Sequence, residues 1–203
     1  MTDNFIGIMM GYTASGKSTA AKRIAKKTSA DLYHSAIIRR ELGYKFTKEQ
    51  AKEDFFLLTS DLRKKMDIEV YSKLAENCKE SLIKNRNVVL DAGFFFKWQR
   101  QLIYKSVTDL NPEIFIVRTE CPEEEIFKRI NDRHRKFSDS EFNETPSLKA
   151  YESSKKVFQD PIGDIIDNNG TPVIISYNSR TKSINVLDTK KSRNLNNIID
   201  SLK

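Results

Sequence analysis

Eight residues near the amino terminus have the spacing of a phosphate-binding loop. Residues 11–18 read Gly-Tyr-Thr-Ala-Ser-Gly-Lys-Ser, which matches the pattern G-x-x-x-x-G-K-[ST]. Glycines let such a backbone curl so that consecutive N–H groups point at phosphate oxygens. Lys17 would reach the β- and γ-phosphates, and the Ser18 hydroxyl would bind Mg²⁺. The sequence therefore predicts a site for ATP or another nucleoside triphosphate, with its Mg²⁺. The residues expected to bind this ligand are Gly11, Thr13, Ala14, Ser15, Gly16, Lys17, Ser18 and Thr19.

A carboxylate ends the second strongly apolar run of the chain. Asp91 follows Val88-Val89-Leu90, which has the composition of a buried strand. In open α/β sheets, ligands bind outside the carboxyl ends of the strands. Asp91 would there hold Mg²⁺ through a water molecule or orient an acceptor hydroxyl. The alternative interpretation is a helix N-cap for the segment that follows.

Three arginines are further candidates for contact with phosphate. Arg129 and Arg133 are four residues apart on a predicted helix and share one face of it. Phosphoryl transfer spreads negative charge over equatorial oxygens, which arginines bind in bidentate fashion. Cations that merely complement a helix dipole are the alternative. Arg39, on another predicted helix, would contact an anionic acceptor or the transferring phosphate, unless it lies on an exposed face.

The elements that must position these residues alternate between strand and helix. This alternation favours an α/β fold with a largely parallel sheet. The last two predicted strands would form a terminal hairpin, or one would join the main sheet. Strands are expected at 5–10, 32–34, 88–91, 114–117, 172–177 and 184–187. Helices are expected at 18–27, 35–42, 98–107, 122–135 and 147–158.

A long helical pattern fills the interval before Lys84. A capping box at 47–50 would start it, and we expect a break or bend near 65–68. Within it, Val70, Leu74, Cys78 and Leu82 recur every four residues and form one apolar stripe. Cys78 is therefore predicted to be a core residue rather than a reactive thiol.

Composition limits the classes of protein to consider. The chain has 203 residues, of which 38% are hydrophobic and 31% charged, so we expect one soluble domain over 1–203. No apolar stretch approaches the roughly 20 residues of a membrane span, and we expect no signal peptide. Two cysteines without C-x-x-C spacing favour reduced thiols in a cytoplasmic protein.

The chain carries a formal net charge of +7, which favours an anionic partner. A nucleotide alone would satisfy this preference, and a lysine-rich solvated surface is the plainer explanation. The tail after Tyr177 is a candidate footprint for RNA or DNA, although it lacks interleaved aromatic residues. Its basic residues are Arg180, Lys182, Lys190, Lys191 and Arg193.

The order and spacing of these segments over residues 5–160 resemble the P-loop kinases of the AAA domain type. This group is related to polynucleotide 5′-hydroxyl kinase, zeta toxins and chloramphenicol phosphotransferase. Arg100 and the segment 151–155 also match it in position, but only the P-loop is highly specific. The resemblance implies a three-layer P-loop NTPase sandwich with a mostly parallel five-stranded sheet of order 2-3-1-4-5. It also implies a helical lid at about 122–150, and we expect a C-terminal extension at about 171–203.

Position 36 departs from the pattern of that group. There the segment after the second strand reads Asp-x-x-Arg, and the Asp acts as base toward the acceptor hydroxyl. Ser35 and Arg39 match, but Ala36 stands at the Asp position, and a methyl group accepts no proton. Three explanations stay open: Ala36 is an engineered substitution that traps a substrate complex, Asp91 supplies the carboxylate, or the protein binds ATP without efficient transfer. Loss of a base typically costs roughly 10²–10⁴-fold, not all activity.

We therefore expect an ATP- and Mg²⁺-dependent kinase that transfers the γ-phosphoryl group to a hydroxyl. The favoured acceptor is a nucleic-acid end or a nucleotide-like molecule. A small-molecule acceptor, such as an antibiotic, sugar or nucleotide sugar, is the alternative. A non-enzymatic ATP-binding switch is a further alternative. The residues expected to act in transfer are Lys17, Arg39, Asp91, Arg129 and Arg133, together with position 36.

Overall fold

A six-stranded sheet forms the centre of the molecule. The computed structural model describes residues 4–44, 61–136, 148–166, 170–187 and 192–203. The strand order is β2-β3-β1-β4-β5-β6, and all neighbours are parallel except β5 and β6. The predicted order 2-3-1-4-5 is confirmed, and β5 both joins the main sheet and forms a hairpin with β6. The strands are β1 (Phe5–Met10), β2 (Asp31–His34), β3 (Val88–Asp91), β4 (Glu113–Glu120), β5 (Val173–Asn178) and β6 (Ile184–Val186).

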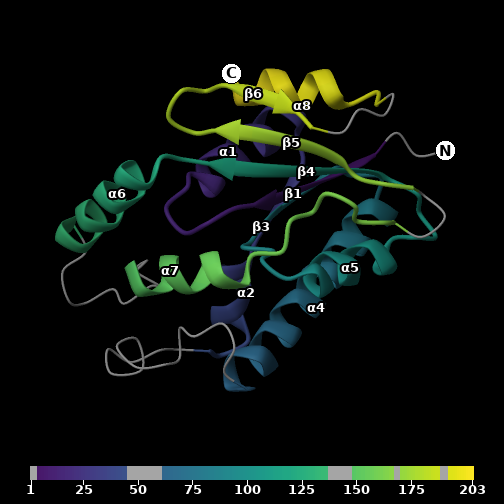
Figure 1. Ribbon diagram of the computed structural model, residues 1–203. Helices are drawn as coiled ribbons and strands as arrows, with labels where there is room; N and C mark the ends of the chain where they lie inside the picture. Colours follow the sequence, from purple (N-terminus) through teal and green to yellow (C-terminus); the bar gives the residue numbers. More distant parts are fainter. Residues whose placement is uncertain (1–3, 45–60, 137–147, 167–169, 188–191) are drawn as a thin grey trace.

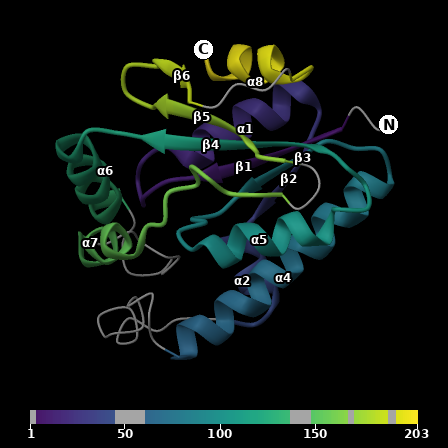
Figure 2. The same ribbon diagram turned by 45° about the vertical axis from the view of Figure 1, so that its right-hand side comes forward.

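Helices cover both faces of this sheet, as the three-layer prediction requires. Figure 1 shows α1 and α8 on one side of the sheet, and α4 and α5 on the other. In Figure 2, α6 and α7 lie side by side beyond the carboxyl end of β4. The described helices are α1 (Lys17–Thr28), α2 (Ser35–Glu41), α4 (Asp61–Ile83), α5 (Lys97–Ser106), α6 (Glu123–Lys136), α7 (Leu148–Val157) and α8 (Leu195–Leu202). In this described part, no helix is long and apolar enough to cross a bilayer.

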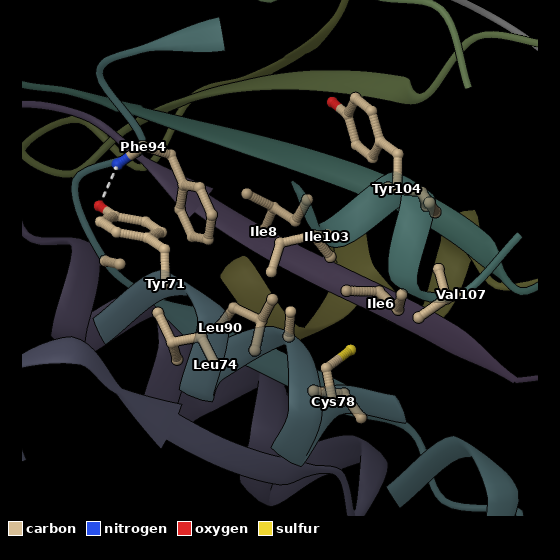
Figure 3. Packing of buried hydrophobic residues seen from close by; sticks show 14 of the residues in the cluster. Ile6, Ile8, Tyr71, Leu74, Cys78, Leu90, Phe94, Ile103, Tyr104 and Val107 are labelled. Carbon is tan, nitrogen blue, oxygen red and sulfur yellow. Dashed lines mark hydrogen bonds between the residues drawn. The ribbon is translucent and has the colours of Figure 1, made fainter. Parts of the chain in front are cut away.

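The side chains of β1 alternate between the two layers of helices. Ile6 and Ile8 belong to the core cluster with α4 and α5, whereas Phe5 and Met9 belong to the cluster with α1 and α8. Figure 3 shows the first cluster, in which the side chains of β1 lie close to those of both helices. A strand between two helical layers buries both of its faces, so its side chains on both faces are apolar. This explains why β1 is a continuous apolar run. Cys78 is fully buried in the first cluster, which confirms its prediction as a core residue.

Two predictions about helices need correction. The expected break near 65–68 is wrong, because α4 is continuous over Asp61–Ile83. Met66 is buried one turn before Val70, so the apolar stripe simply begins earlier, and the neighbouring lysines face solvent. Helix α8 was not predicted, although Leu195, Ile198 and Leu202 have helical spacing and pack in the cluster with α1. The capping box at 47–50 lies outside the described residues.

Candidate phosphoryl-transfer site

The P-loop joins β1 directly to α1 through conformations that suit glycine. Gly11 has φ 145° and Gly16 has φ 101°, both in the range that L side chains rarely adopt. A Cβ on Gly16 would lie 2.8 Å from the Cβ of Ser179, and one on Gly11 would lie 2.5 Å from Thr119 Oγ1. Gly16 is the N-cap of α1, so the loop leads into the unpaired N–H groups of the first helical turn. This is the geometry of an anion site.

A buried hydroxyl pair fastens this loop to β4. The hydroxyls of Ser15 and Thr119 lie 2.8 Å apart, and Thr119 Oγ1 donates to the Met10 carbonyl at 3.1 Å. Ser15 is wholly buried. Its hydroxyl therefore serves as an anchor of the loop, a role that sequence reasoning did not identify because its partner lies in a distant strand.

Lys17, the lysine of the motif, contacts the backbone of the P-loop. Lys17 Nζ donates to the Tyr12 carbonyl at 2.7 Å. This contact keeps the ammonium group beside the backbone that would receive the phosphates. Thr13, Lys17 and Ser18 are half-buried, whereas Thr19 is exposed.

Asp91 lies at the carboxyl end of β3, next to the strand that carries the P-loop. It is the register partner of Met9 in β1 and of His34 in β2. The residue is 2% exposed, and within the described residues its buried Oδ2 accepts no hydrogen bond. Oδ2 lies 3.3 Å from His34 Nε2. A carboxylate oxygen that is buried and incompletely bonded fits a role as acceptor for a metal-bound water.

Oxygen donors at this edge of the sheet suit Mg²⁺. The Ser18 hydroxyl and the Asp91 carboxylate are hard ligands of the kind that Mg²⁺ takes, with phosphate oxygens and waters completing the octahedron. In the ranges that the structure describes, no group of three or more His, Cys, Asp or Glu residues could hold a metal on its own. A metal here would depend on the nucleotide phosphates.

His34 was not identified from the sequence as a site residue. It is the N-cap of α2, and its Nδ1 accepts the N–H of Ala36 at 3.1 Å. Burial lowers the pKa of His34, an effect that Asp91 opposes and that Lys17 and other cations reinforce. The imidazole is therefore neutral near pH 7. Because Nδ1 accepts a hydrogen bond, the proton lies on Nε2, the nitrogen nearer to Asp91.

Arg39 is buried on α2, so the interpretation as an exposed helix face is wrong. It is 5% exposed. Burial is the main cause that lowers its pKa to about 10, with a contribution from Arg63, while Asp67 opposes the shift. Arg39 therefore stays charged at pH 7. Arg63 and Asp67 form an ion pair at 3.0 Å on α4, and Ala36 lies half-buried one turn before Arg39.

Arg129 of α6 contacts the P-loop directly. Its Nη1 donates to the Ala14 carbonyl at 3.2 Å and to Ser179 Oγ at 3.0 Å. Its Nε donates to Glu125 at 2.9 Å, which fixes the guanidinium from its own helix. The structure thus brings Arg129 to the loop. The side chain of Arg133 lies outside the described residues.

Aromatic side chains join the P-loop to the two helices at the carboxyl edge. The ring of Tyr12 lies 5.5 Å from that of Tyr151 and 5.1 Å from that of Phe158. Phe127 of α6 in turn lies 5.7 Å from Tyr151. Sequence reasoning matched the segment of Tyr151 by position only, and the contact gives it a physical role in holding α7 against the loop.

The loop that follows Asp91 is held by buried polar groups. Phe94 has φ 50°, and its N–H donates to the Tyr71 hydroxyl at 3.1 Å, the dashed line in Figure 3. Arg100 is wholly buried, donates to the Phe94 carbonyl at 3.0 Å and pairs with Asp164 at 2.6 Å. Arg100, which matched the kinase group in position, is thus committed to supporting this loop.

Comparisons with known proteins agree with this geometry. A family model described as AAA domain matches residues 6–160. The protein Kti12 of Saccharomyces cerevisiae is 25% identical over 122 residues, which are 60% of this chain and 38% of that protein. The chain thus spans well under half the length of this curated relative.

Solved structures show the same fold at low identity. A sugar kinase from Janibacter sp. HTCC2649 superposes with a TM-score of 0.58 at 13% identity, covering 85% of this chain and 84% of that one. The APS kinase CysC of Mycobacterium tuberculosis, in complex with AMPPNP and APS, superposes with a TM-score of 0.53 at 16% identity, covering 100% and 99%. With three quarters of its length matched by one family model, the chain belongs to the AAA domain family and has the fold of P-loop kinases.

Proposed function

We propose that this protein is an ATP- and Mg²⁺-dependent kinase that phosphorylates a hydroxyl of a small molecule. The observation that carries the proposal is the pairing of two adjacent strands. β1 leads into the P-loop with Lys17 beside it, and β3 ends at Asp91. A loop that binds phosphates next to a carboxylate that holds Mg²⁺ is the donor site of P-loop phosphoryl transfer.

Each residue has a part in this mechanism. When bound, Mg²⁺ would neutralise charge that develops on the phosphates. Ser18 and Asp91 would hold it, and Lys17 would stabilise the β- and γ-phosphate oxygens. Arg129 positions the nucleotide side of the P-loop through its bonds to the Ala14 carbonyl and Ser179. The acceptor hydroxyl oxygen would form a bond to the γ-phosphorus as the bond from that phosphorus to the β–γ bridging oxygen breaks. ADP would leave with the bridging oxygen, and the hydroxyl proton would pass to the transferred phosphoryl group or to solvent.

Position 36 makes the proposed turnover slow. The half-buried Ala36 follows the N-cap of α2 by two residues and offers no carboxylate to the acceptor hydroxyl. Because positioning and electrostatics supply most of the catalysis in phosphoryl transfer, a site without a base still acts. We expect Ala36→Asp to raise the transfer rate by up to roughly 10²–10⁴-fold.

A small-molecule acceptor has better support than a nucleic acid. Two proteins of the same fold are a sugar kinase and an APS kinase, both named for small acceptors. The net charge of +7 is met equally well by a triphosphate.

A transfer assay tests the proposal. The protein and its Ala36→Asp variant are incubated with γ-labelled ATP, Mg²⁺ and separate pools of sugars and sugar acids, nucleotides, and RNA or DNA ends. Label in a small-molecule pool, absent with Lys17→Met, supports the proposal. Label only in nucleic acid, with affinity falling steeply as salt rises, refutes the acceptor class. Tight ATP binding without transfer by either protein would refute the kinase proposal in favour of a nucleotide-binding switch.

A further inference from the structure

We infer that His34 is a positioning residue that holds the carboxylate of Asp91 in place for Mg²⁺. The inference rests on the proposed function, in which Asp91 is the protein carboxylate of the metal site. The register of β2 and β3 places the two residues directly beside each other at the carboxyl edge of the sheet. His34 Nε2 lies 3.3 Å from Asp91 Oδ2.

Both nitrogens of the imidazole have defined surroundings. Nδ1 accepts the Ala36 N–H at 3.1 Å, which locks the ring against the amino-terminal end of α2. The ring nitrogen that remains, Nε2, is the one that faces Asp91. A neutral imidazole whose Nδ1 is an acceptor carries its hydrogen on Nε2, so the group presented to the carboxylate is a donor.

The carboxylate needs such a partner because it is buried. Asp91 is 2% exposed, and within the described residues its Oδ2 accepts no hydrogen bond. The 3.3 Å contact with His34 is therefore the main polar constraint on that oxygen in the described part of the chain. Groups that hydrogen-bond a metal-holding carboxylate orient it, and their loss typically costs about 10–100-fold in metal affinity or activity.

The same contact gives α2 a link to the metal site. One imidazole touches the amide of Ala36 at the start of α2 and the carboxylate at the end of β3. Arg39 lies on the same short helix. His34 therefore fixes the distance between the helix that carries Arg39 and the carboxylate that holds Mg²⁺, independently of any side chain at position 36.

His34→Asn separates the two roles of the imidazole. Asparagine is among the best N-cap residues, so its Oδ1 can accept the Ala36 N–H and preserve α2. Its side chain is too short to reach Asp91 as well. We expect the same midpoint of thermal unfolding as the parent and the same ADP affinity without metal. The Mg²⁺ concentration that gives half-maximal enhancement of ADP binding should rise about 10-fold or more.

Three further measurements sharpen the test. His34→Gln keeps an N–H donor on a longer side chain and should recover part of the Mg²⁺ affinity. In the transfer assay, His34→Asn should lower kcat at limiting Mg²⁺, leave KM for ATP unchanged at saturating Mg²⁺, and recover as Mg²⁺ is raised. The chain has only two histidines, so nitrogen NMR of histidine-labelled protein should resolve His34 as the Nε2–H tautomer, with His134→Asn for assignment.

Three outcomes would overturn the inference. These are a Mg²⁺ dependence of ADP binding that His34→Asn leaves unchanged, a His34 ring found as the Nδ1–H tautomer, and equal loss of stability in both variants, which would make His34 only a cap. If the parent protein binds nucleotide with Mg²⁺ but transfers no phosphoryl group, the proposed function fails, while the Mg²⁺ titration still decides the role of His34.

Discussion

Gly16→Ala tests the geometry of the P-loop most sharply, because two separate costs meet at this position. The residue has φ 101°, and the left-handed conformation costs an L-residue roughly 1–2 kcal/mol. The new Cβ would also lie 2.8 Å from the Cβ of Ser179 and 3.0 Å from its Oγ. Overpacking of this kind typically costs about 1–3 kcal/mol. Together these two costs are at least about 2 kcal/mol. The Gly16→Ala loop must overcome this cost to adopt the binding conformation, so the variant should bind ADP about 30-fold more weakly.

A double-mutant cycle with Ser179→Gly separates the two costs. The affinity for ADP is measured by calorimetry in the parent, both single variants and the double variant. Ser179→Gly removes the bond from Arg129, but the cycle cancels that loss. Without the Ser179 side chain, only the backbone cost of about 1–2 kcal/mol should remain for Gly16→Ala.

Gly163→Ala is the matched control for backbone strain. Gly163 has φ 84°, and a Cβ there would meet nothing within 4 Å. This variant should lose stability while ADP affinity stays at the parent value. Parent-like binding by Gly16→Ala would refute the argument about the loop, and an equal penalty with and without the Ser179 side chain would refute the steric part of it.

Other residues give independent tests. Arg100→Met leaves the buried Asp164 without its cationic partner and should lower the free energy of unfolding in urea by about 3–5 kcal/mol. A change below about 1 kcal/mol would contradict the supporting role of Arg100. Arg129→Gln removes charged hydrogen bonds to the P-loop and Ser179 and should weaken ADP binding about tenfold, and an unchanged dissociation constant would argue against the contact. Burial raises the pKa of the Cys78 thiol to about 12, so Ellman's reagent at pH 8 should label only Cys121 until urea unfolds the chain; two rapidly reacting thiols in the folded protein would contradict that burial.

The features that could be predicted from the sequence are those encoded locally. The P-loop is a contiguous motif, and the strands at 5–10 and 88–91 are apolar runs that need no partner to be identified. Asp91 was found because a residue at the end of a buried strand lies at the ligand edge of an α/β sheet. The strand order came from the resemblance, since periodicity does not specify which strands pair.

The missed features depend on residues that are distant in the sequence. The Ser15 hydroxyl meets Thr119 of β4, and the role of Arg100 depends on Asp164 in the segment after α7. His34 gains its meaning only from the register between β2 and β3. Local patterns hold no signal for these pairs. The break predicted near 65–68 was a different error, because Met66 and Val70 continue the buried face of α4 through that segment.

The central claim is that the P-loop and Asp91 deliver a γ-phosphoryl group to a small hydroxyl acceptor. The most direct measurement follows labelled γ-phosphate from ATP by phosphorus NMR with the Ala36→Asp protein, Mg²⁺ and the small-molecule pools. The account predicts a phosphate ester that forms in step with ADP and is absent with Lys17→Met and with Asp91→Asn. Label that stays in ATP, or that appears only as inorganic phosphate at a rate indifferent to the pools, would contradict it.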